Sequence, residues 1–195
     1  MSDTRTRILE AALASFTHKG VAATTIGDIR ERSGASTGSI YHHFGSKEGM
    51  AATLYVEGLA SYHAAALEQI AARPPAHEAI PALVSHHLHW IQRHPDLSRF
   101  LLNTRQAEFM ADQSDTIRAA NKRFIRTLSD WIRFEVSVGR LRDLPADVYL
   151  PLILGPSHEL ARHWLAGRIR TPLTTCARAL AEAAWRSLAP GERDD

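Results

Sequence analysis

Apolar residues recur at helical spacing along nearly the whole chain. In the first segment, Ile8, Ala12 and Phe16 follow one another at four-residue intervals, which places them on one face of a helix. Ala, Leu and Arg, which favour helices, are the commonest residues of the chain. The pattern therefore predicts an all-α protein, and no internal repeat is visible.

Capping residues divide the start of the chain into short elements. We expect helices over about residues 3–18, 25–33 and 37–43. Gly20 suits a left-handed cap after the first helix, and Thr25 with Asp28 suits a variant of the capping box before the second. Ser36 is placed to cap the third helix. These elements predict a three-helix head over residues 1–46.

A larger helical body is predicted for residues 47–195. The helix over 47–72 connects the head to this body and stops before Arg73-Pro74-Pro75. Further helices are expected at about 76–93, 96–110, 114–138, 146–167 and 172–188. Pro156 predicts a kink within the fourth of these.

The segment TTIGDIRERSGASTGSIYHHFGSK, residues 24–47, has the layout of a helix-turn-helix unit. In that unit the second short helix enters the major groove of DNA, N-terminal residues first. Its first residues here are small or able to form hydrogen bonds. Tyr41 can contact a phosphate or a thymine methyl group, and Lys47 lies at a helix start, where a phosphate is favoured.

The same segment resembles the signature of TetR-family transcriptional regulators, over about a quarter of the chain. The matching residues are Thr24-Thr25, Asp28-Ile29, Gly34-Ala35-Ser36, Gly38, Ile40-Tyr41, His43-Phe44 and Ser46-Lys47-Glu48. The resemblance implies an all-α homodimer with an N-terminal DNA-binding domain and a C-terminal domain for effector binding and dimerisation. Most members are repressors that small molecules release from their operators.

Carried over position by position, the resemblance implies DNA contacts from part of the head. These residues are Thr25, Thr37, Gly38, Tyr41, His43 and Lys47, with Ser36, Ser39 and His42 among them. Gly27 and Thr37 are small where other members carry longer side chains. We therefore expect base recognition to depend on DNA shape, backbone contacts and water.

Composition changes this picture little. The chain has 23 Lys+Arg against 21 Asp+Glu, which gives a net charge of +2. A prediction of DNA binding therefore depends on where the DNA-contacting side chains lie and not on the total charge. Hydrophobic residues at 45% and charged residues at 23% are typical of a soluble globular protein. The single cysteine excludes an internal disulfide, and without a secretory signal or membrane span we expect a cytoplasmic protein.

The last two helices are the candidates for a dimer interface. Their apolar stripes and small residues predict a four-helix contact between two chains. The residues expected there are Leu154, Ala161, Cys176, Leu180, Ala184 and Leu188. The alternative is that both helices complete the core of the monomer.

A small-molecule effector pocket is expected in the middle of the body, where aromatic residues cluster and a few polar groups accompany them. The candidate residues are His89, Trp90, Arg105, Phe109, Trp131, Phe134, His158 and Arg162. Alternatively, Glu159 pairs with Arg162 or His163 on the surface. His86 and His89 have the spacing of a metal pair, but we prefer a partly solvated histidine-rich face and expect no metal.

These patterns and the family resemblance together imply a ligand-responsive DNA-binding transcriptional regulator, and we expect a repressor that a small molecule releases from its operator. No cofactor is expected, because no glycine-rich phosphate loop is present, and no catalytic spacing is visible either. Two alternatives stay open. A small α-helical enzyme would turn over a substrate without DNA, and a histidine-rich metal-binding protein would hold stoichiometric metal.

Overall fold

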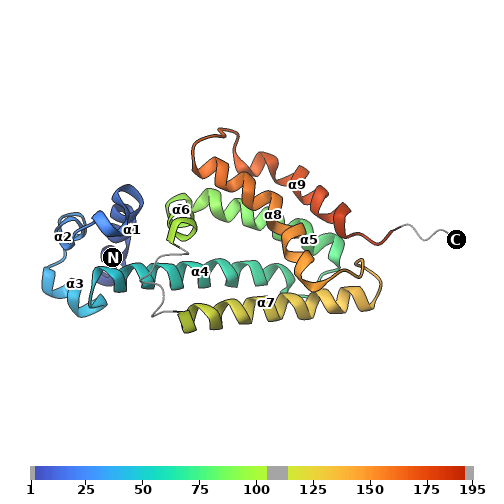
Figure 1. The fold of residues 1–195 in the computed structure, drawn as a ribbon, viewed down its shortest axis with the longest axis horizontal. Coiled ribbons are helices and arrows are strands. Elements are labelled where there is room, and N and C mark those ends of the chain that lie inside the picture. The colour runs from blue at the N-terminus through green and yellow to red at the C-terminus, as the bar shows by residue number, and fades with distance from the viewer. Residues whose placement is uncertain (1–2, 105–113, 192–195) are drawn as a thin grey trace. The chain divides into compact units, whose positions relative to one another are not determined.

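The computed structural model describes residues 3–104 and 114–191, and the regular elements in these ranges are α-helices (Figure 1). This confirms the predicted all-α class. The helices are α1 (Thr4–Ala23), α2 (Ile26–Ser33), α3 (Thr37–Phe44), α4 (Lys47–Ala71), α5 (Ala76–Arg93), α6 (Pro95–Thr104), α7 (Ser114–Ser137), α8 (Ala146–Leu165) and α9 (Leu173–Leu188).

The end of α1 differs from the prediction. Gly20 has a φ of 78° but an extended ψ of 159°, so it interrupts the helix without forming the expected left-handed cap. One further turn follows to Ala23, and the chain then closes back when the Thr24 N–H donates to the Gly20 carbonyl at 3.2 Å. Glycine permits this positive φ without steric cost.

The helices form two compact units. The N-terminal unit comprises the described parts of residues 1–61 and 95–120, and the C-terminal unit comprises residues 62–94 with the described part of 121–195. Helix α4 contributes its first half to one unit and its last turns to the other. The domain boundary expected near residue 46 stays a prediction, and the compact units divide the chain differently because α6 packs against α1.

The N-terminal unit has its own apolar core, which holds α1, α2 and α3 on the first half of α4. Ile8, Ile29, Ile40 and Met50 are almost fully buried in it. Burying side chains of this size contributes about 1.5–3 kcal/mol each. Helix α6 closes the core, because the rings of Phe100 and Phe16 stack with their centroids 6.0 Å apart.

The C-terminal unit is built on α5, α8 and α9, which all contact one another. Small residues along α9 let the helices approach closely. Ala184 and Leu188 of α9 and Ala161 of α8, all expected at the dimer interface, are buried within the chain itself. Their apolar stripes pack inward, in agreement with the alternative of a monomer core. Leu154, Cys176 and Leu180 stay partly exposed.

The start of α5 is capped by a residue of α7. Pro75 precedes α5 and has no side-chain oxygen to cap it. Instead, the fully buried Glu135 carboxylate accepts a hydrogen bond from the Ala76 N–H at 2.9 Å. Arg140 donates to the same carboxylate at 2.8 and 2.7 Å, and this hydrogen bond raises the pKa of Arg140. Glu135 thereby satisfies a buried helix terminus from 59 residues away.

No helix among the described residues combines the length and the hydropathy needed to cross a membrane.

Helix α8, in which a kink was expected at Pro156, runs unbroken through both Pro151 and Pro156.

Candidate functional site

The short helices α2 and α3 begin where the sequence predicts. Thr25 and Asp28 form the expected capping box, in which the Thr25 hydroxyl accepts from the Asp28 N–H at 3.1 Å and the Asp28 carboxylate accepts from the Thr25 N–H at 2.8 Å. Gly34 then turns the chain with a φ of 67° and a ψ of 9°, in the left-handed region that favours glycine. Ser36 caps α3 by accepting from the Ser39 N–H at 3.1 Å.

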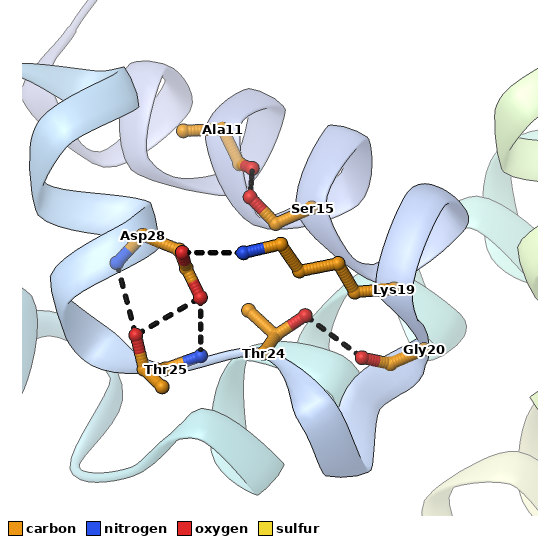
Figure 2. A network of polar contacts seen from close by, with 7 residues as sticks. All are labelled: Ala11, Ser15, Lys19, Gly20, Thr24, Thr25 and Asp28. Atoms are coloured by element: carbon orange, nitrogen blue, oxygen red, sulfur yellow. Dashed lines mark hydrogen bonds and ion pairs between the residues drawn. The ribbon is translucent and has the colours of Figure 1, made fainter.

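A polar network fixes α2 to α1 (Figure 2). Lys19 of α1 donates to the Asp28 carboxylate at 2.7 Å, and the Thr24 hydroxyl donates to the Gly20 carbonyl at 2.7 Å. The hydrogen bond from Lys19, together with those from Thr25, lowers the pKa of Asp28 to about 2. The ionised carboxylate therefore stabilises the fold above pH 3.8, and this contribution is lost as the pH falls through about 2.

Replacing Thr25 with alanine is expected to destabilise the N-terminal unit by about 1 kcal/mol, because α2 loses its cap. Urea unfolding followed by circular dichroism measures the change. The matched control is Thr25→Ser, which keeps the capping hydroxyl and should unfold close to the wild type. Equal stability of Thr25→Ala and the wild type would contradict this role.

Helix α3 presents one face to the core and the other to solvent. Ile40 is buried in the core of the unit, and the partly buried Phe44, four positions later, packs against the same core. The opposite face carries Thr37, Gly38, Tyr41, His42 and His43, which are all exposed. Tyr41 is 50% exposed, an unusual exposure for a large ring, so this face has a surface that the unit itself does not cover.

Gly38 has no packing role within the chain. A Cβ atom built at this position would lie 4.0 Å from the Ser36 hydroxyl and would meet nothing else within that distance. A glycine near the start of a helix permits close approach either of DNA or of a neighbouring helix. The open space around Gly38 favours the approach of an external molecule.

Other predicted contact residues are already engaged within the unit. The hydroxyls of Thr25 and Ser36 cap helices, and Ser39 is half-buried. The Lys47 ammonium donates to the Ala22 carbonyl at 3.0 Å and is 20% exposed. Lys47 therefore holds the start of α4 against the last turn of α1, a structural role that sequence reasoning did not identify.

The residues expected at an effector pocket are divided between several places in the C-terminal unit. Arg162 pairs with Glu159, and His163 contacts the same carboxylate at 2.9 Å, as in the surface alternative. Phe134 is 40% exposed, Trp131 donates to the Pro74 carbonyl at 3.3 Å, and His89 is exposed on its helix. Arg105 and Phe109 lie outside the described residues.

Trp90 and His158, by contrast, belong to one aromatic cluster that is centred on Tyr62. The Tyr62 ring contacts Trp90 with centroids 5.2 Å apart and His87 with centroids 5.6 Å apart, and His87 stacks on His158 at 5.8 Å. The Tyr62 hydroxyl is 2.8 Å from the Nδ1 of His87. Tyr62 was not among the residues that the sequence indicated, because it lies 25 positions from His87.

Burial keeps His87 and His63 uncharged at neutral pH. It lowers the pKa of His87 to about 3, with smaller contributions from His158 and His86, and lowers the pKa of His63 to about 4. The ring of His63 stacks on Phe124 with centroids 4.2 Å apart. Within the part of the chain that the structure describes, no three His, Cys, Asp or Glu residues are placed to hold a metal ion.

Comparisons with known proteins agree with the geometry of α2 and α3. Residues 8–54 match the sequence model described as bacterial regulatory proteins, tetR family. The repressor KstR2 of Rhodococcus jostii is 47% identical over 49 residues, which are 25% of this chain and 24% of that protein. The match thus covers about a quarter of that curated relative's length.

Solved structures extend the likeness of fold to nearly the whole chain. The TetR family transcriptional regulator PfmR of Thermus thermophilus has a TM-score of 0.75 and 25% identity, over 92% of this chain and 97% of that one. The regulator FadR of Bacillus subtilis, in complex with stearoyl-CoA, has a TM-score of 0.78 and 19% identity, over 92% and 96%. Residues 8–54 of this chain thus carry the sequence pattern of the tetR family of bacterial regulatory proteins, within a fold that resembles those of solved TetR family regulators.

Proposed function

We propose that this protein is a DNA-binding transcriptional repressor that acts as a homodimer in the cytoplasm and is released from its operator by a small molecule. The observation that carries the proposal is the exposed face of α3, with its uncovered Tyr41 and the open space at Gly38. The naming of KstR2 as a repressor and the stearoyl-CoA bound to FadR support the regulatory and ligand-binding parts.

In the proposed complex, α3 enters the major groove of operator DNA with its N-terminal end first. Tyr41, His42 and His43 reach base edges or phosphates, and Gly38 lets the helix backbone approach the groove. The proposed contacts of Thr25 and Thr37 rest on the family resemblance, and Ser36 and Ser39 are included because they lie among these residues. Lys47 reaches a phosphate only if it exchanges its bond to the Ala22 carbonyl.

A homodimer follows from the symmetry of operator recognition, because two recognition helices read two half-sites. The partly exposed Leu154, Cys176 and Leu180 on α8 and α9 are the predicted residues still available for the contact. Helix α4 belongs to both compact units, so it is the element through which an effector in the C-terminal unit changes DNA affinity. The absence of enzymatic activity stays part of the proposal.

The experiment selects DNA from a library of duplexes with a randomised core and then measures affinity for the selected duplex by fluorescence anisotropy. Tyr41→Ala is expected to weaken binding about tenfold, because the ring contacts are lost. Raising the salt concentration from about 50 to 200 mM should weaken wild-type binding about a hundredfold, because phosphate contacts release counterions. The control is Ile125→Ala, which removes an equally exposed apolar side chain from α7.

Two results would contradict the proposal. One is the failure of selection to enrich any sequence over the starting library. The other is an affinity that neither salt nor Tyr41→Ala changes, since both act on the surface that the proposal assigns to DNA.

A further inference from the structure

The Tyr62 cluster holds buried polar atoms that the protein leaves without partners. His87 is 6% exposed, and its Nε2 has no hydrogen-bond partner among the described residues. The Nε2 of His86 and the Nδ1 of His63 are also buried and unpartnered, and both rings contact Tyr62. Burying such an atom is costly when nothing replaces the water that it would bind. Three of them around one tyrosine indicate a place where a bound molecule supplies the missing partners.

The hydrogen bond from Tyr62 defines what His87 can offer. Burial raises the pKa of Tyr62, so its hydroxyl keeps its proton. No other acceptor for this hydroxyl is found among the described residues, so it donates to the Nδ1 of His87 at 2.8 Å. A neutral imidazole that accepts at Nδ1 carries its proton on Nε2. His87 therefore presents a hydrogen-bond donor and requires an acceptor.

The charge of the surroundings restricts the partner further. Every lysine and arginine described in the C-terminal unit is exposed. His87 and His63 are uncharged at neutral pH, so neither of them supplies a cation to compensate a buried anion. Burial of an unpaired charge is far more costly than burial of a hydrogen-bonded neutral group.

The rings of the cluster favour an apolar, flat partner. Trp90 and Tyr62 meet edge to face, and His63 lies parallel to Phe124. Aromatic surfaces of this kind bind planar apolar molecules through offset stacking and edge contacts.

We infer that His87, oriented by Tyr62, is the polar contact for an uncharged effector that carries a carbonyl or other neutral oxygen acceptor on a flat apolar body. This inference rests on the proposed function, in which the C-terminal unit binds the effector. It assigns the class of molecule and the atom that recognises it. Tyr62 lies on α4, so the contact at His87 acts directly on the helix that both units share.

The test compares two probes with the same body, 2-acetylnaphthalene as the neutral ketone and 2-naphthoate as the anion. Isothermal titration calorimetry on the full chain at neutral pH gives both affinities. The ketone should bind at least about tenfold more tightly than the carboxylate, because only the carboxylate must bury a charge. Histidine-labelled protein should show a shifted His87 ring resonance in NMR spectra with the ketone.

The variants test whether His87 itself, and no other residue of α5, contacts the ketone. His87→Phe keeps a planar ring and removes the donor, and it should weaken ketone binding about tenfold. His87→Gln keeps a donor and should retain part of the affinity. The matched control is His77→Phe, because His77 is an exposed histidine on the same helix, and its replacement should leave binding unchanged.

Equal affinity for the two probes, no binding of the ketone, or wild-type affinity in His87→Phe would each overturn the inference. The DNA selection described above keeps this result separate from the proposed function. A protein that selects an operator but fails these ketone tests retains its function as a regulator and loses only the assigned effector class. A protein that binds the ketone at His87 but enriches no DNA has the inferred binding site and lacks the proposed DNA-binding function.

Discussion

Replacing Glu135 with alanine is expected to lower the free energy of unfolding of the C-terminal unit by about 3 kcal/mol or more. The variant leaves the buried Ala76 N–H at the start of α5 without an acceptor, since the preceding residue is proline and offers no cap. It also opens a cavity in place of a fully buried side chain. Both effects act on the helix that carries His87.

Urea unfolding followed by tryptophan fluorescence measures this effect, because all four tryptophans lie in the C-terminal unit. Glu135→Gln keeps an acceptor for Ala76 and should lose about half as much stability. The matched control is Glu159→Ala, which breaks an exposed ion pair on α8 and should change stability little. If Glu135→Ala unfolded at the same urea concentration as Glu159→Ala, Glu135 would not be holding α5 in place.

The elements that the sequence predicts well are those with local signals. The capping box of Thr25 and Asp28 and the cap at Ser36 connect residues three positions apart, so their geometry follows from the sequence itself. The same holds for the apolar spacing that buries Ile40 and Phe44. The exposed face of α3 then follows, because a short helix that buries one face must present the other.

Interactions between distant segments could not be predicted in this way. The Tyr62 and His87 side chains lie 25 positions apart, and Glu135 lies 59 positions from Ala76. No periodicity identifies such pairs, because they depend on which helix faces meet in the fold. The apolar stripe of α9 shows the same limit. Its pattern is equally compatible with a partner chain and with the monomer core, and only packing places Ala184 and Leu188 inside.

Adding a side chain at Gly38 is expected to affect folding and DNA binding in opposite directions. Alanine at this exposed helical position should stabilise the free protein by about 0.5 kcal/mol, because glycine is a poor helix former and the added Cβ meets only the Ser36 hydroxyl, at 4.0 Å. Leucine should fit the free protein as well. On DNA, the leucine would occupy the space between the α3 backbone and the groove and displace several contacts together.

Affinity for the selected duplex should therefore fall modestly in Gly38→Ala and about a hundredfold or more in Gly38→Leu, since each lost base contact is worth about 1–3 kcal/mol. Anisotropy titrations and urea unfolding on the same preparations give both quantities. The matched control is Glu10→Leu, which adds an exposed leucine to α1 in the same unit. Because an intact fold accompanies the expected loss of affinity, the loss would locate the DNA contact at α3. Wild-type affinity in Gly38→Leu would move that contact to another surface of the N-terminal unit.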